Sequence, residues 1–415
     1  MLPQNMGSET NVKLPFSFFF FSMVALLLSQ TILVLNTGEF ASGNFRTPAI
    51  WSAAHLFILG WALMVAMGSM YQLVPVAFLT PIWNEKFGYV QFGVSSVGII
   101  SFASFLFWSP QHALIPGVLT VLGIFMFLIQ MLMTLRNQAR PNILTVFVGT
   151  GLLCLFLTIF FGIALIISWK TGLLGAGYQA FFKSHLLLGV GGWFTFLIFG
   201  FSYKMVPMFS LSHGYSMGLA KYVYICYVTG IVVTIISFFT NESLLMKLGF
   251  FLLFIGFSLF AWHVSMIIKK RIKRKLDKPF MFALSGIGFG VFLHALFFLN
   301  LFTQNKTNLI GPLLFLYLML WIVLSILGYL YKIVPFLWWT HKYSKEIGKK
   351  TVPALKDMLN ENLAVTLLSI LILSCFIIYL GFIIQISAIL TIGIVLLALS
   401  ILSTAISILL VILNK

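Results

Sequence analysis

Residues 61–75, WALMVAMGSMYQLVP, contain the spacing Trp-x6-Gly-x2-Tyr-x2-Val-Pro, which occurs twice more further along the chain. The second copy is residues 193–207, WFTFLIFGFSYKMVP, and the third is residues 321–335, WIVLSILGYLYKIVP. Trp and Pro are scarce, with 10 and 13 copies in 415 residues, so five matched positions in three copies are not an accident of composition. A spacing repeated at nearly equal intervals indicates an architecture of three related units.

Each copy lies near the end of a long apolar run. The chain is 61% hydrophobic and 8% charged, whereas soluble domains have about a quarter of their residues charged. About 20 apolar residues are enough for a helix to cross a bilayer. Twelve runs qualify, approximately 16–36, 50–79, 88–108, 113–135, 143–168, 180–210, 220–239, 246–268, 280–301, 310–338, 361–383 and 387–413. We therefore expect an all-α integral membrane protein with about 12 transmembrane helices.

The distribution of positive charge predicts the orientation. The first apolar run is too long for a cleavable signal core and has no cleavage site after it, so we expect the first helix to be retained. With the N-terminus inside, 20 of the 25 Lys and Arg residues fall on the inner side, as the positive-inside rule requires. Both termini are then inside. We interpret the two densest basic clusters, 269–278 and 342–356, as topology signals that attract anionic lipid headgroups, with a protein-docking site as the alternative. No nucleic-acid partner is expected.

Dividing twelve helices by the repeat gives one membrane domain, 1–415, with three four-helix pseudo-repeats, 16–135, 143–268 and 280–413. The motif then falls on the second helix of each repeat. Its Gly is expected to let helices approach closely, and its Pro to kink or end the helix near the inner side. Its Tyr is expected near the inner interface, with the hydroxyl toward water or backbone.

Ionisable residues within the helices are few. All eight Asp and Glu residues map to loops, tails or helix ends, which argues against an ion-coupled transporter or a carboxylate-relayed proton pump. Histidines remain: His55, His185 and His294 map to the outer parts of helices, and His112 to an outer loop. A neutral imidazole is a good ligand for haem iron or copper. The alternative for each is a hydrogen bond to a neighbouring helix.

His55 and His185 do not hold equivalent places in the repeat. They precede their motif prolines by 20 and 22 residues, and two residues rotate an α-helical side chain by roughly 200°. Whether they converge is left open by the sequence.

Three smaller features have two interpretations each. His213 and His341 each follow a motif Pro by six residues. They are interpreted either as a metal or proton site on the inner side or as loop histidines in contact with water. Met64, Met67 and Met70 lie roughly on one helix face. They are interpreted either as ligands of Cu(I) or as residues that pack in the core. The three cysteines, Cys154, Cys226 and Cys375, lie singly in apolar runs and are interpreted as buried packing residues.

Twelve helices in three four-helix arcs, with Arg46-x8-His55 followed by Gly68-x2-Tyr71-Gln-Leu-Val-Pro, resemble subunit I of the haem-copper oxidase superfamily, which includes cytochrome c oxidases and nitric-oxide reductases. The topology is similar along the whole chain, and the residues match over about 46–78. The resemblance implies that His55 occupies the low-spin haem ligand position and that Arg46 pairs with a haem propionate.

The sequence also departs from that family. The resemblance calls for two histidines on the tenth helix and a copper-binding pair on the seventh, but 311–338 and 221–240 contain none. Dioxygen or nitric-oxide reduction is therefore not expected.

The leading hypothesis is binding of haem b, or copper, by His55 with His185 or His294, in respiratory electron transfer or oxidase cofactor supply. The expected location is a bacterial plasma membrane, with oxidase subunits or an electron donor as partners. The alternative is a cofactor-free transporter or oxidase-assembly scaffold.

Overall fold

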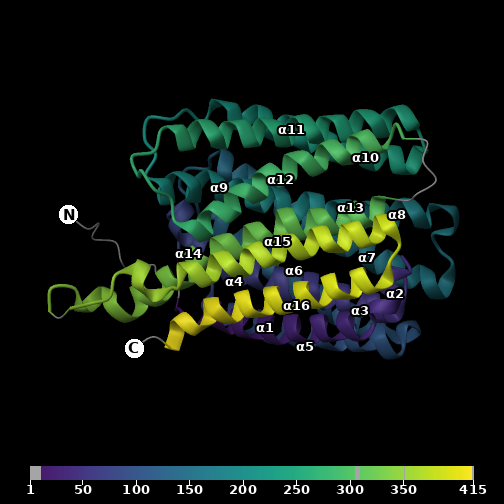
Figure 1. Cartoon of the computed structure of the whole chain (residues 1–415), viewed down its shortest axis with the longest axis horizontal. Coiled ribbons are helices and arrows are strands. Elements are labelled where there is room, and N and C mark those ends of the chain that lie inside the picture. Colours follow the sequence, from purple (N-terminus) through teal and green to yellow (C-terminus); the bar gives the residue numbers. More distant parts are fainter. Residues whose placement is uncertain (1–10, 304–308, 350, 414–415) are drawn as a thin grey trace. The chain divides into compact units, whose positions relative to one another are not determined.

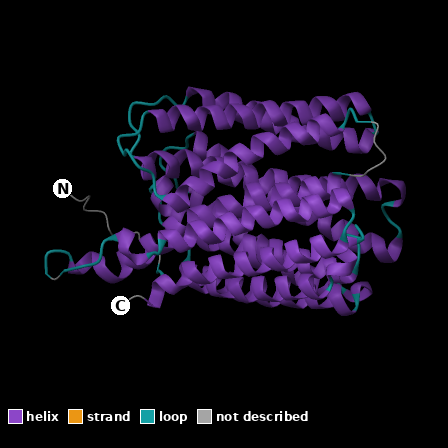
Figure 2. Ribbon diagram, viewed as in Figure 1, coloured by secondary structure: helices purple, strands orange, loops and turns teal. Residues whose placement is uncertain are grey.

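The computed structural model describes residues 11–303, 309–349 and 351–413. Helices joined by turns make up this part of the chain (Figure 2). One isolated antiparallel bridge joins Ser212 and Arg271. Within it, twelve helical stretches are long and apolar enough to cross a membrane. The predicted all-α, twelve-helix membrane fold is confirmed.

The stretches follow one another in three sets of four. The first set is α1 (Lys13–Leu35), α3 to α4 (Pro48–His55 and Met64–Phe78), α5 (Glu85–Trp108) and α6 (Leu114–Arg136), with the short α2 (Thr37–Ala41) after α1. The second set is α7 (Ile143–Thr171), α8 to α9 (Tyr178–Leu186 and Thr195–Ser210), α10 (Gly218–Thr240) and α11 (Ser243–Lys269). The third set is α12 (Lys278–Asn300), α13 to α14 (Ile310–Leu316 and Leu324–Tyr343), α15 (Glu361–Ile384) and α16 (Ser387–Leu409).

The second helix of every set changes from α to π geometry and back. The π-helical segments are Leu56–Leu63, Leu187–Phe194 and Tyr317–Val323. Each contains the Trp of the repeated motif, and Trp61, Trp193 and Trp321 are at most 1% exposed. π-Helical turns are rare and occur often at functional sites, because they widen the helix and redirect its carbonyls. The apolar pattern did not predict them.

The chain forms two compact units. Figure 1 labels the helices and colours them along the sequence. Unit 1 comprises Met1–Asn137, Asp277–Leu284 and Val323–Lys415, and unit 2 comprises Gln138–Leu276 and Ser285–Ile322. In unit 1, α1 packs against α3, α4, α5 and α16. In unit 2, α7 packs against α8 and α9, and α10 packs against α11.

The third and fourth helices of every set pair as a hairpin, α5 with α6, α10 with α11 and α15 with α16. Glycines let the two backbones of each hairpin approach. A Cβ on Gly98 would lie 2.7 Å from the Thr120 backbone nitrogen, and one on Gly256 would lie 2.8 Å from that of Tyr227. Such close backbone approach is typical of membrane helices, which lack a hydrophobic drive toward one another.

The motif glycines pack the second helix of each set against the first, as expected. A Cβ on Gly68 would lie 2.9 Å from Phe18 Cβ of α1, and one on Gly200 would lie 3.1 Å from Phe147 Cβ of α7. On Gly328 it would lie 2.7 Å from both the backbone nitrogen and Cβ of Ala283, on α12. The motif glycine is therefore a helix-packing position in all three copies.

The motif tyrosines are buried, where the sequence predicted hydroxyls directed toward water or backbone. Tyr71, Tyr203 and Tyr331 are at most 2% exposed, and each hydroxyl bonds a side chain. The partners lie on another helix of the same set: Gln91 Oε1 at 3.1 Å, His263 Nδ1 at 3.1 Å and Ser407 Oγ at 2.7 Å. Because a buried hydroxyl without a partner is costly, each set supplies its own polar group. The three partners differ in residue type, so the repeat did not reveal them.

The motif prolines lie inside their helices. Two of these helices end three residues later, at Phe78 and Ser210, and the next residues, Leu79 and Leu211, have left-handed φ values of 52° and 53°. The third helix continues past Pro335 to Tyr343. The predicted termination near the Pro therefore holds for two copies and not for the third.

Unit 1 also contains an ion pair next to the motif. Lys332 forms an ion pair with Asp277. Lys332 follows motif residue Tyr331 on α14, and Asp277 lies just before α12. Both side chains are about one-fifth exposed, at 17% and 20%. The pair joins the first and second helices of the third set near their inner ends.

Candidate functional site

His55 is the last residue of α3, immediately before the first π-helical segment. It is half-buried, and the edge of its ring meets Phe102, with ring centroids 5.2 Å apart. Its Nδ1 lies 2.7 Å from the Trp51 carbonyl oxygen. A carbonyl only accepts hydrogen bonds, so Nδ1 bears the proton and, in the neutral ring, Nε2 bears the lone pair. Metal-ligating histidines have this same arrangement.

In the second set, His185 lies near the end of α8, one residue farther from the π-helical segment that follows than His55 is from its own. Its Nδ1 lies 2.9 Å from the Thr158 carbonyl oxygen on α7, which again fixes the proton on Nδ1. The ring packs against Gly162, where an added Cβ would lie 3.1 Å from its Cε1. His185 is thus held by the neighbouring helix, whereas His55 is held by its own.

His294 does not fit a ligand role. It is 5% exposed on α12, and its Nδ1 lies 2.7 Å from the Gly290 carbonyl oxygen. The remaining lone pair, on Nε2, faces the Tyr227 hydroxyl at 3.3 Å. The Phe257 ring also lies against the imidazole, with centroids 4.4 Å apart. A metal at Nε2 would have to displace the Tyr227 hydroxyl within a closely packed aromatic cluster.

His294 belongs to a buried polar network in unit 2. Tyr227 Oη lies 3.1 Å from the Gly191 carbonyl oxygen and 3.4 Å from Tyr317 Oη. Tyr317 Oη lies 2.8 Å from Thr195 Oγ1, which accepts from Trp321 Nε1 at 3.1 Å. Gly191, Tyr317 and Trp321 all lie in π-helical segments. The widened turns therefore place carbonyls and motif side chains where they bond one another.

This network is sensitive to one hydroxyl. Tyr227 has a single proton for two acceptors, Gly191 O and His294 Nε2, so Tyr227→Phe leaves one acceptor without its donor and takes the hydroxyl away from both. We expect Tyr227→Phe to destabilise the protein by about 1–3 kcal/mol. The measurement is the thermal unfolding midpoint in detergent, with Tyr222→Phe as the control, because Tyr222 is on the same helix and 59% exposed. Equal midpoints for the two variants would contradict a stabilising role for the network.

His263 was missed as a functional candidate. It is 1% exposed on α11, its Nε2 lies 2.8 Å from the Ser216 carbonyl oxygen, and its Nδ1 faces the Tyr203 hydroxyl. Both nitrogens are used in joining α9, α11 and the turn between α9 and α10. The one available signal was a lone histidine near the inner end of an apolar run in the same set as Tyr203.

The other candidates lie at the surface or in the core. Arg46 is exposed between α2 and α3, and His112 is exposed beside Ser109, whose Oγ is 2.8 Å from its Nδ1. His213 is exposed in unit 2, and His341 is exposed in unit 1 beside Trp338.

The sulfur-containing candidates lie in the core. Met64, Met67 and Met70 are fully buried, Cys154 and Cys375 are buried, and Cys226 is half-buried. Met67 Sδ accepts from Gln91 Nε2 at 3.5 Å, which is a packing arrangement.

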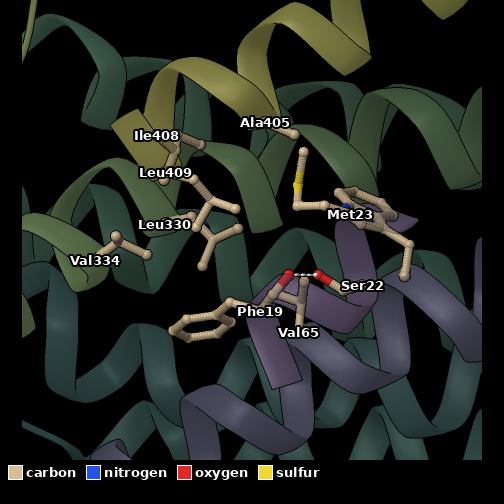
Figure 3. Close-up of a pocket in the computed structure, with 10 residues that line it drawn as sticks. Phe19, Ser22, Met23, Val65, Leu330, Val334, Ala405, Ile408 and Leu409 are labelled. Atoms are coloured by element: carbon tan, nitrogen blue, oxygen red, sulfur yellow. Dashed lines mark hydrogen bonds between the residues drawn. The ribbon is translucent and has the colours of Figure 1, made fainter. Parts of the chain in front are cut away.

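A small pocket lies in unit 1 beside the first motif Trp (Figure 3). Its volume is about 20 Å³, and its lining comes from α1, the Trp61–Val65 turn, α14 and α16. Its one hydroxyl, on Ser22, already donates to the Phe19 carbonyl at 2.7 Å. The pocket is therefore apolar and has room for about one small molecule such as water, far less than a macrocycle requires.

Among the described residues, no three His, Cys, Asp or Glu side chains come together as a metal-binding group. A multi-histidine copper centre of the kind the resemblance implies needs such a group. The residues do fit a site with a single imidazole ligand, at His55 or at His185, since both have the required tautomer.

Comparison with known proteins gives the fold. No protein-family model and no curated protein matches the sequence. In structure, the chain is similar to one in the cryo-EM structure of a haem-copper terminal oxidase dimer, with a TM-score of 0.68 and 13% identity. The match covers 96% of this chain and 84% of that chain. At this identity the likeness establishes the fold and nothing finer. The protein is a multi-pass membrane protein with a fold like that of haem-copper oxidase subunit I.

Proposed function

We propose that the protein binds a b-type haem, or copper, through His55 or His185 and serves respiratory electron transfer or the supply of cofactor to an oxidase. The observation that carries this proposal is the tautomer of the two rings. Each donates from Nδ1 to a backbone carbonyl, which leaves the lone pair on Nε2, the form in which imidazole binds a metal. The bound group would supply the redox chemistry, and the protein would orient the imidazole.

Dioxygen and nitric-oxide reduction are not part of this proposal. The helices in which the resemblance calls for further ligands, 221–240 and 311–338, contain no histidine. The two buried histidines on other helices, His263 and His294, have their lone pairs directed at tyrosine hydroxyls. We also propose a bacterial plasma-membrane location, with oxidase subunits or an electron-donor protein as partners.

Cofactor content of the detergent-purified full chain tests the proposal. We expect about one haem b per chain in the alkaline pyridine assay, or about one copper by metal analysis, because the proposal uses one imidazole ligand, His55 or His185. Substoichiometric traces that wash out during a second purification step would contradict it.

A second function is favoured by the network in unit 2. Side chains of this chain fill and hydrogen-bond the region around Tyr317 and Trp321, as expected for a cofactor-free scaffold in oxidase assembly. Such a protein would be colourless and would co-purify with oxidase subunits. A transporter of a neutral solute is the remaining alternative, and uptake by reconstituted vesicles would test it.

A further inference from the structure

Six of the seven residues from Lys269 to Lys275 are Lys or Arg, at the C-terminal end of α11. Lys269, Lys270, Arg271, Arg274 and Lys275 are exposed. Under the positive-inside rule this segment is at the inner membrane surface. We call Lys269–Lys275 the basic loop.

The basic loop is fixed to the protein rather than projecting from it. The Ile272 N–H donates to the Leu211 carbonyl at 3.1 Å, and the His213 N–H donates to the Lys270 carbonyl at 3.3 Å. These bonds surround the Ser212–Arg271 bridge. Arg271 Nη1 also donates to the Ile268 carbonyl at 3.3 Å, which orients its guanidinium. The charges are therefore held at the inner end of unit 2 and do not sample a large volume.

An apolar surface continues from the basic loop along α11. Trp262, Met266 and Lys269 are spaced by four and three residues, so they share one helix face. Trp262 is 59% exposed and Met266 is 45% exposed, and Ile272, inside the loop, is 68% exposed. Trp262 lies seven residues before Lys269, on the order of 10 Å deeper at 1.5 Å per residue. Tryptophan at such a depth is typical of the membrane interface.

Unit 2 offers these cations little negative charge of its own. Glu242 is its one acidic residue in sequence, and it precedes α11, at the opposite end of that helix from the basic loop. Asp277, the next acid after the loop, is ion-paired with Lys332. The complementary charge must therefore come from outside unit 2.

We propose that the basic loop and the Trp262–Met266 face bind an anionic phospholipid of the inner leaflet. Its phosphate bonds Arg271 and Arg274, and one acyl chain lies along Met266 and Trp262. Arginine suits this role because its planar fork bonds two phosphate oxygens. A lipid fits better than an acidic protein, since the exposed apolar residues continue below the charges at acyl-chain depth.

The test measures lipid-dependent stability of the full chain. Purified protein is placed in nanodiscs of phosphatidylcholine with or without phosphatidylglycerol, and bound lipid is counted by native mass spectrometry. We expect phosphatidylglycerol to be retained and to raise the unfolding midpoint. Arg271→Gln/Arg274→Gln/Lys275→Gln should weaken retention by roughly 100-fold, at about fivefold per charge. The matched control is Lys345→Gln/Lys349→Gln/Lys356→Gln, which removes three exposed charges from the other inner cluster.

Equal loss in both triple variants would overturn the proposal, because it would show attraction by net charge alone. Equal midpoints in the two lipids would also overturn it and would point to an acidic protein partner. Inorganic phosphate at matched concentration should give no shift, since it lacks the acyl chain. Trp262→Ser keeps every charge and should also weaken retention, so the proposal can be tested even if the triple variant fails to fold.

Discussion

If His185 is the ligand, a His185→Ala protein is expected to lose its bound cofactor while keeping its fold. The imidazole is fixed by the Thr158 carbonyl and packs on Gly162, so no other side chain replaces its lone pair at that point. Removing even an outer-shell partner of a metal ligand costs about 10–100-fold in affinity. Loss of the ligand itself should reduce occupancy by at least tenfold. His55→Ala is measured in parallel, and whichever variant loses the cofactor identifies the ligand.

The control for both variants is His294→Gln. His294 is buried with both nitrogens in hydrogen bonds, so its replacement should alter stability and leave cofactor content unchanged. Occupancy is measured by haem and copper content per chain, and folding by size-exclusion profile. If His294→Gln loses the cofactor and the other two variants retain it, the tautomer argument is wrong.

Gly328→Val is expected to prevent normal assembly of unit 1. The added Cβ would lie 2.7 Å from the backbone nitrogen of Ala283, and backbone cannot move aside as a flexible side chain can. Overpacking a core costs about 1–3 kcal/mol when side chains can adjust, so we expect more than about 3 kcal/mol here. The readouts are yield of monodisperse protein and thermal midpoint.

The three motif glycines should differ in a defined order. Gly68→Val meets the Pro15 carbonyl oxygen at 3.0 Å and should be nearly as damaging, whereas Gly200→Val meets mainly the Phe147 and Val148 side chains at 3.1 and 3.2 Å. Gly288→Val on α12 is the control, because a Cβ there has no atom within 4 Å. A Gly288 variant as unstable as the Gly328 variant would show that loss of glycine, rather than steric conflict, is the cause.

Much of the fold could be predicted from the sequence because bilayer thickness and helix rise together determine span length. The twelve apolar runs correspond to the observed stretches, and the repeat located the second helix of every set. The likeness around His55 pointed to the oxidase fold, which structural comparison supports at only 13% identity.

The candidate site was less predictable because the carbonyls that hold its two imidazoles come from different places, Trp51 on the same helix for His55 and Thr158 on the neighbouring helix for His185. The two π-helical segments, Leu56–Leu63 and Leu187–Phe194, are eight residues long each, so they do not remove the two-residue offset between the histidines. The role of His294 was hidden for another reason: its lone pair is used by Tyr227, 67 residues earlier on another helix. Such tertiary pairs leave no local pattern.

The most direct test of the central claim is a dithionite-reduced minus oxidised visible spectrum of the purified protein, with the His55→Ala/His185→Ala double variant alongside. The account predicts sharp b-type haem bands, or a copper signal by metal analysis, in the wild type and their loss in the double variant. A featureless wild-type spectrum with no copper would contradict it and favour the cofactor-free scaffold.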